Sequence, residues 1–111
     1  MGRRLCFALD LIDDAALIAD YEARHAPGAV WPAVVAHIRA RGFESMEIWR
    51  TGDRMVMIAE VADDFPRAAA DPPENAEWEA LMWRFQRALP HAGEGEKWLE
   101  MTRIFSLDEQ G

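Results

Sequence analysis

Apolar and polar side chains alternate along residues 3–11, near the start of the chain. The large apolar residues occupy every second position, at Leu5, Phe7, Leu9 and Leu11. This period of two predicts a β-strand with one clearly apolar face. Residues 43–50 and 55–61 also have the character of strands. The turn sequence at 51–54 separates them, so we expect these two segments to form a hairpin.

Helical patterns fill the interval between the first two strands. Asp13-Asp14 suits a helix N-terminus, because Asp caps free N–H groups and favours the positive end of the helix dipole. Apolar and aromatic residues then follow at helical spacing: Leu17, Ile18, Tyr21 and His25. Pro27-Gly28 ends this helix. Pro32 suits the first turn of a second helix, which we expect to reach Arg41 and stop at Gly42.

The last third of the chain is broadly helical at first and then extended. We expect a short helix from residue 68, a break at 71–73 and a longer helix over 74–89. Residues 97–107 have the pattern of a last strand, and 108–111 are expected to form a frayed tail.

The predicted order is β-α-α-β-β-α-β in one domain covering residues 1–111. This order is typical of the α+β, ferredoxin-like (split βαβ) fold, in which a four-stranded antiparallel sheet carries its helices on one face. The strands supply more large apolar side chains than one covered face needs: Met46, Ile48, Trp49, Met55, Met57, Trp98, Met101 and Phe105. We therefore expect a homodimer packed through or around its open sheet faces.

Composition and charge exclude several classes of partner. The chain has 111 residues and a net charge of −8, which argues against binding to nucleic acid or to an anionic membrane surface. No segment has the apolar length of a membrane span or the features of a signal peptide, so we expect a cytoplasmic protein. One cysteine, Cys6, and three scattered histidines give no metal-ligand pattern. We expect no metal and no cofactor.

Tyr21 and His25 are the most suggestive chemical pair. They lie four residues apart, so both side chains emerge from one face of the predicted helix. His25 falls in the last turn, where free carbonyl groups favour an imidazolium. A histidine partly protonated near neutral pH is suited to general acid catalysis. Spacing alone also fits a Tyr and a His that only pack and cap the helix end.

The segment from Tyr21 to Pro27, followed by Trp31-Pro32, resembles the Y-x-x-x-H-x-P-x-W-P motif of the L-rhamnose mutarotase family, with Gly28-Ala29 as two extra residues. The similarity continues along nearly the whole chain, including Gly42 before the second strand. It also includes the EWEALM helix and the closing Met101-x-x-Ile104-Phe105 segment. The resemblance implies a dimeric α+β barrel and an aldose 1-epimerase that interconverts the α and β anomers of a 6-deoxy-L-sugar.

The resemblance also implies roles for individual residues. The histidine matching His25 is the proton donor, and the tyrosine matching Tyr21 contacts the sugar. Two further substrate-binding positions depart from the family pattern. Met46 stands where the family's rhamnose enzymes carry a Tyr, and Trp78-Glu79 stands where they carry Trp-Trp. Because a lost hydroxyl donor and a lost ring change which sugar hydroxyls are satisfied, these departures favour L-fucose over L-rhamnose.

Three readings of function therefore follow. The first is a cofactor-independent mutarotase acting on L-fucose, or alternatively on L-rhamnose, with Glu79, Glu100 or His25 itself as the base. The second is a monooxygenase-like or heme-binding protein on the same fold. The third is a non-catalytic dimer that binds a small ligand, in which Tyr21 and His25 only shape the pocket.

Overall fold

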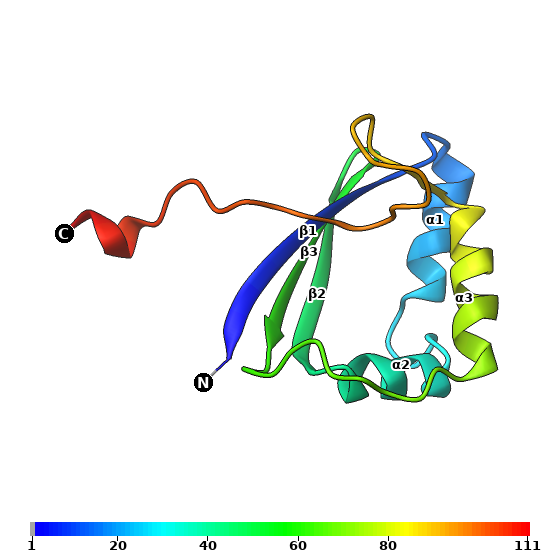
Figure 1. Cartoon of the computed structure of the whole chain (residues 1–111). Coiled ribbons are helices and arrows are strands. Elements are labelled where there is room, and N and C mark those ends of the chain that lie inside the picture. Colours follow the sequence, from blue (N-terminus) through cyan, green and yellow to red (C-terminus); the bar gives the residue numbers. More distant parts are fainter. Residues whose placement is uncertain (1) are drawn as a thin grey trace.

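The computed structural model describes residues 2–111. The chain forms two helices between its first two strands, as expected: β1 (Arg3–Leu11), α1 (Ala15–Arg24), α2 (Pro32–Ala40) and β2 (Phe43–Thr51). The elements that follow are β3 (Arg54–Val61), α3 (Pro73–Trp83), β4 (Gln86–Arg87), β5 (Leu99–Glu100) and the 3₁₀ helix η1 (Leu107–Gln110). The helices lie on one side of a curved sheet, and residues 101–111 extend away from the other side (Figure 1).

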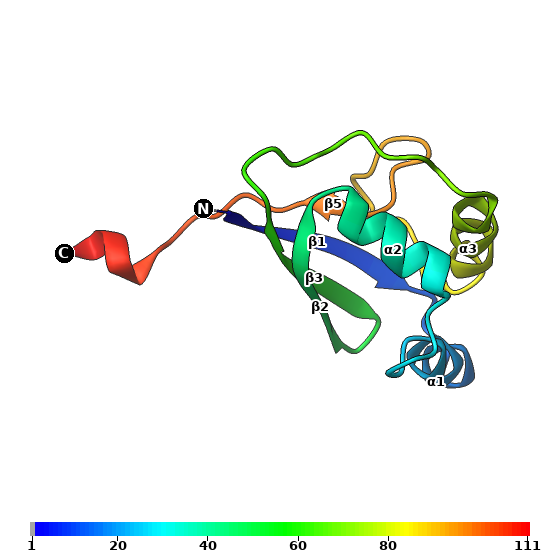
Figure 2. The ribbon, with the colours of Figure 1, turned by 90° about the horizontal axis from the view of Figure 1, so that it is seen from below.

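Local sequence signals set the boundaries of α1 and α2. Asp14 caps α1, because its Oδ1 accepts a hydrogen bond from the backbone N–H of Leu17 at 2.9 Å. Pro32 is the first residue of α2, where the missing N–H costs nothing. Gly42 follows α2 with φ at +106°, a conformation that disfavours any residue with a Cβ. Seen from below, α1 and α3 are viewed end-on, whereas α2 is viewed from the side (Figure 2).

The sheet is antiparallel in the order β2-β3-β1-β4, with β5 also paired to β1. The fourth position of the ferredoxin-like sheet is therefore filled by two short pieces on one edge of β1. The α+β class and the antiparallel sheet order expected from the sequence are confirmed.

The last third of the chain differs from expectation in four places. No helix forms over residues 68–71, and α3 ends at Trp83 rather than Leu89. Its end is tightened by hydrogen bonds from Arg84 N to Leu81 O and from Phe85 N to Met82 O. The chain then joins the edge of β1, since Ile12 N donates to Phe85 O at 2.8 Å.

The last strand is also much shorter than predicted. Only Leu99–Glu100 pair with β1, extended by one bond from Met101 N to Cys6 O at 2.7 Å. Residues 102–106 are extended but unpaired, and η1 replaces the expected frayed tail. The pattern of residues 97–107 is apolar enough for a strand, but beyond Met101 the segment makes no pairing with β1.

The methionines of β3 belong to the helix-covered face. Met55 and Met57 are 1% and 7% exposed and alternate with partly exposed Val56 and Ile58. By register, Met46 lies opposite Ala59 and Ile48 opposite Met57, so these side chains share the covered face. Four of the eight large apolar residues that the sequence analysis counted therefore lie on the covered face, which leaves fewer of them for the open face. Trp49, which lies opposite Val56, is on the open face and 61% exposed.

An ion pair stabilises the open face at the hairpin end. Asp10 is 3% exposed and lies opposite Arg54 in the register of β1 and β3. Arg54 Nε and Nη2 donate to its two carboxylate oxygens at 2.6 and 3.0 Å. Hydrogen bonding to Arg54 lowers the pKa of Asp10, although burial opposes the change. The ionised form of the Asp10 carboxylate is therefore favoured in the folded state.

We expect Asp10→Asn to lower the free energy of unfolding by about 1–3 kcal/mol at pH 7. The buried side chain at position 10 would no longer carry the negative charge that pairs with Arg54. Since the folded-state pKa of Asp10 is below its ordinary value of 3.8, this contribution is present above pH 3.8 and is lost as pH falls through the folded-state pKa. Urea unfolding at pH 7 and at lower pH measures both effects.

Glu60→Gln is the matched control, because Glu60 pairs with Arg4 across the same two strands on the same face but at an exposed position. Exposed pairs contribute little, so this variant should change stability much less. Equal losses of stability in Asp10→Asn and Glu60→Gln would contradict the larger stabilising role assigned to Asp10.

Candidate active site

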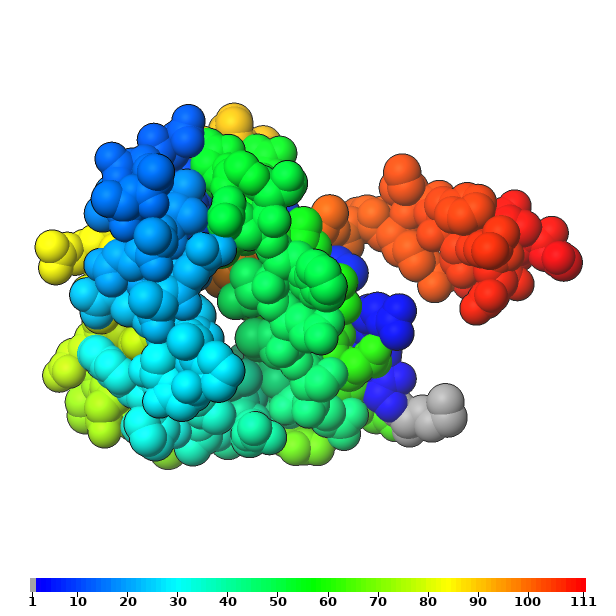
Figure 3. Space-filling model, turned by 180° about the vertical axis from the view of Figure 1, so that it is seen from behind, coloured from blue at the N-terminus to red at the C-terminus, as the bar shows by residue number. Residues whose placement is uncertain are grey.

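A hollow opens between α1 and the β2–β3 hairpin, and it contains both residues of the Tyr-His pair. We call it the His25 hollow; its volume is about 150 Å³. Its walls come from three elements, α1, β2 and β3, through Tyr21, Glu22, His25, Ile48, Arg50 and Met55. The space-filling view shows the gap between α1 and β2 from outside (Figure 3).

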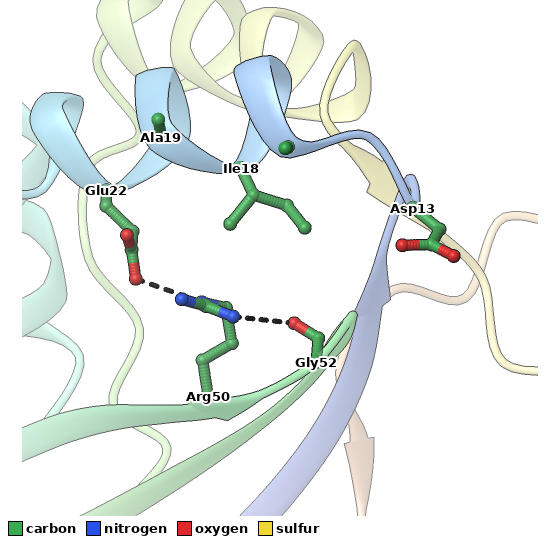
Figure 4. Close-up of a pocket in the computed structure, with 7 residues that line it drawn as sticks. Asp13, Ile18, Ala19, Glu22, Arg50 and Gly52 are labelled. Atoms are coloured by element: carbon green, nitrogen blue, oxygen red, sulfur yellow. Dashed lines mark hydrogen bonds and ion pairs between the residues drawn. The ribbon is translucent and has the colours of Figure 1, made fainter.

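A second hollow adjoins the first, and we call it the Ile18 hollow. Its volume is about 310 Å³. It is lined from α1, the segment before it and the hairpin turn, by Asp13, Ala15, Ile18, Ala19, Glu22, Arg50 and Gly52 (Figure 4). Glu22 and Arg50 line both hollows. Together the two hollows fall in the size range of small-molecule sites, about 300–1,000 Å³.

His25 is held by the end of its own helix. Its backbone caps α1, and its ring packs on the Tyr21 ring with centroids 4.2 Å apart. Nδ1 lies 2.7 Å from the carbonyl oxygen of Tyr21. Because a carbonyl oxygen only accepts hydrogen bonds, Nδ1 carries the proton and donates. In the neutral ring, Nε2 then has a free lone pair.

Burial lowers the pKa of His25 from its ordinary value of 6.5, and the hydrogen bond to the Tyr21 carbonyl only partly opposes this change. The sequence suggested that the helix end would favour an imidazolium. In the structure, loss of solvent outweighs that effect. The neutral imidazole with Nε2 as a base is therefore the favoured resting form near neutral pH.

Tyr21 lies at the centre of the core, 4% exposed and packed against Phe85. Burial raises its pKa to about 12, so the phenol stays protonated. Its oxygen accepts a hydrogen bond from Gln86 Nε2 at 3.0 Å, which leaves the phenol proton available for another acceptor. Gln86, 6% exposed, was missed by the sequence analysis because only the register of β4 with β1 brings it here.

Trp78 lies beside His25, and its neighbour Glu79 is less closely associated with the hollow. The Trp78 ring meets the His25 ring edge-on at 5.6 Å and the Trp31 ring at 5.1 Å. Glu79 Oε2 is exposed and pairs with Lys97 Nζ at 2.7 Å. The fold thus brings Tyr21, His25 and Trp78 together.

Met46 and Glu100 lie outside the lining of the His25 hollow. Met46 shares the covered face of β2 with Ile48, two residues further along the strand, and only Ile48 reaches the lining. Glu100, one of the expected candidate bases, is exposed on β5 opposite Phe7.

The structure adds an ion pair that sequence reasoning did not single out. Arg50 Nε donates to Glu22 Oε2 at 2.9 Å, and Arg50 Nη1 donates to the carbonyl oxygen of Gly52 at 2.8 Å (Figure 4). Nothing in the spacing of Glu22 along the chain distinguishes it from the other carboxylates of the sequence. The two residues are 28 positions apart, so no local signal could have paired them.

Two further features of residues 2–111 concern classes of site. No group of three or more His, Cys, Asp or Glu side chains in this range is arranged to hold a metal ion. None of the helices described there is long and apolar enough to cross a membrane.

The fold and the hollow define a small α+β protein equipped for proton transfer to a small polar molecule, with a neutral imidazole, a neutral phenol and an indole ring. Comparison with known proteins makes this more specific. Residues 4–107 match the family described as L-rhamnose mutarotase. The chain belongs to this family.

Individual relatives support the assignment. The chain is 54% identical over 112 residues to the L-fucose mutarotase of Xanthomonas campestris pv. campestris, covering 96% of this chain and 90% of the relative. It is 33% identical over 110 residues to a UPF0734 protein of Dictyostelium discoideum, covering 91% and 86%. The crystal structure of an L-rhamnose mutarotase from Formosa agariphila shares the fold, with a TM-score of 0.69 at 17% identity, covering 95% and 98%.

We expect the pKa of His25, measured by NMR titration of its ring, to lie below 6.5, because the ring is desolvated by the core around it. The nitrogen shifts of the neutral ring should show the proton on Nδ1. A midpoint above 6.5, or a proton on Nε2, would contradict the geometry described here.

Proposed function

We propose that this protein is an L-fucose mutarotase, an aldose 1-epimerase that interconverts the α and β anomers of a 6-deoxy-L-sugar. The observation that carries the proposal is the 54% identity, over nearly the whole chain, to a relative named L-fucose mutarotase. Membership of the mutarotase family and the free Nε2 of His25 in its hollow support the same reaction.

The proposed reaction needs only proton transfers, and His25 supplies them. Neutral His25 takes the proton of the anomeric hydroxyl on Nε2. The bond between the anomeric carbon and the ring oxygen then breaks, and the imidazolium donates the same proton to the ring oxygen. The free aldehyde group rotates and presents its opposite face to the hydroxyl oxygen of the opened ring. The same proton transfers in reverse then close the ring as the other anomer. In this scheme His25 is the proton donor to the ring oxygen and is also its own base.

The neighbouring residues position the sugar. The Tyr21 hydroxyl, already an acceptor from Gln86, donates its proton to a sugar oxygen. Trp78 packs against the His25 ring, and we retain it as a substrate-binding residue although it is buried and lies outside the lining of the His25 hollow. We retain Met46 and Glu79 as residues that tune sugar preference, although neither lines the His25 hollow.

L-Rhamnose is the alternative substrate, because the family as a whole is described by that sugar. Exchange NMR on the anomeric protons of L-fucose and L-rhamnose tests the proposal directly. Enzyme-dependent exchange that is faster for L-fucose supports it. The absence of exchange with both sugars would favour the alternative in which the protein binds a small ligand without catalysis. Oxygen consumption or a coloured preparation would favour the monooxygenase-like or heme-binding alternative.

We expect His25→Gln to lower the rate of anomer exchange by about 10²- to 10⁴-fold, the usual contribution of a general acid–base group, while the protein stays folded. The matched control is His37→Gln. His37 Nδ1 also contacts a backbone carbonyl, that of Ala70 at 2.9 Å, but lies outside both hollows. Full activity in His25→Gln would remove His25 from the mechanism.

We also propose that the protein forms a homodimer, a dimeric α+β barrel built around the open sheet faces. The support is apolar surface without cover in the single chain. Trp49 on the open face is 61% exposed, and the extended C-terminal segment exposes three more large side chains to similar or greater extent, Ile104, Phe105 and Leu107. Exposed apolar groups on this scale are typical of an interface.

We expect the wild-type protein to sediment as a dimer and Trp49→Asp to shift it to the monomer, because a charge would be buried without a partner. Sedimentation velocity over a range of concentrations measures this. Trp83→Asp on α3 is the control, since Trp83 is also partly exposed but lies on the helix side. A Trp49→Asp variant that remains dimeric would place the interface elsewhere.

A further inference from the structure

The Glu22–Arg50 pair occupies the boundary between the two hollows. Glu22 follows Tyr21 on α1, and Arg50 lies near the end of β2, two residues beyond Ile48. Figure 4 shows the two side chains meeting between the helix and the hairpin, with Arg50 also held by the Gly52 carbonyl. The pair is therefore fixed in place beside the hollow that contains His25.

The pair leaves a donor and an acceptor unused. Only Nε of Arg50 contacts Glu22, through Oε2, so the contact is not the two-bond fork that Arg and carboxylate often form. Among residues 2–111, Arg50 Nη2 and Glu22 Oε1 have no hydrogen-bond partner. The side chains are 34% and 54% exposed, so a ligand in the hollows can reach both groups.

An adjacent donor and acceptor match the chemistry of a sugar. Each sugar hydroxyl can accept one hydrogen bond and donate another. A guanidinium N–H can donate to one hydroxyl while a carboxylate oxygen accepts from its neighbour. A hydrogen bond from a sugar hydroxyl to a charged group contributes more than a solvent-exposed ion pair does, so such contacts can govern sugar binding.

We propose that Glu22 and Arg50 together bind two neighbouring hydroxyl groups of the sugar and thereby determine which of the two 6-deoxy-L-sugars is preferred. The inference rests on the proposed mutarotase function. L-Fucose and L-rhamnose have opposite configurations at carbons 2 and 4, so the directions of their neighbouring hydroxyls differ. A rigid donor–acceptor pair satisfies one arrangement and leaves the other with an unpaired polar group.

Arg50→Leu tests the proposal by its effect on the preference between sugars. We expect kcat/KM for L-fucose to fall about 10- to 100-fold, mainly through KM, because binding and not proton transfer is lost. The ratio of kcat/KM for L-fucose to that for L-rhamnose should fall about tenfold or more. Glu22→Gln, which keeps an acceptor but loses the charge, should give a smaller change in the same direction.

Asp20→Asn is the matched control. Asp20 pairs with Arg24 on the same helix and is similarly exposed, but it lines neither hollow, so this variant should leave both values unchanged. Sugar binding is also measured directly by NMR titration of L-fucose into Arg50→Leu and wild type, which separates affinity from turnover. The variant should bind L-fucose about 10- to 100-fold more weakly.

The outcomes separate the inference from the proposed function. A wild-type protein that exchanges the anomers of neither sugar contradicts the proposed function and this assignment with it. An active wild type whose Arg50→Leu variant keeps the same sugar ratio overturns the assignment alone. Equal losses for both sugars would show that the pair only supports the shape of the site.

Discussion

The hydrogen bond from His25 Nδ1 to the Tyr21 carbonyl is the interaction on which the site depends. It exists because α1 ends at Arg24, which leaves carbonyls of the last turn free for a side chain one turn later. The bond selects the tautomer and leaves Nε2 as the unprotonated nitrogen of the neutral ring. The same turn of helix places the two rings against each other, so backbone geometry and ring packing fix the imidazole jointly.

The buried residues of the site are uncharged, and its charged residues lie near solvent. His25 and Tyr21 are both held in their uncharged forms by the core that surrounds them. The charges lie at the boundary with solvent, where Glu22 and Arg50 neutralise each other. In the proposed mechanism the proton would move between the neutral imidazole and the sugar, and the charged Glu22–Arg50 pair would lie beside this step rather than take part in it.

The sequence predicted those features that have local causes. Asp14, Pro32 and Gly42 mark helix boundaries through capping, missing donors and positive φ, and the structure confirms all three. Period-two patterns located the long strands. They could not decide which face of each strand is covered, because a shift of one residue in register exchanges the two faces.

Features with long-range causes were not predictable in this way. The early end of α3 and the division of the fourth strand into two pieces appear only in the tertiary structure, where both pieces pair with β1. Gln86 contacts Tyr21 across 65 positions and Arg50 contacts Glu22 across 28 positions, so only the tertiary fold brings these pairs together. The family motif located Tyr21 and His25, but it gave no information about these partners.

The shortness of β4 has a consequence for how the enzyme moves. The hydrogen bond that orients the Tyr21 phenol comes from Gln86, and Gln86 belongs to a strand of two residues at the edge of the sheet. Edge segments with few backbone bonds are the first to open in native proteins. The buried phenol of Tyr21 is thus oriented by a residue of one of the shortest strands in the fold, so opening of that edge would release the hydrogen bond that holds the phenol.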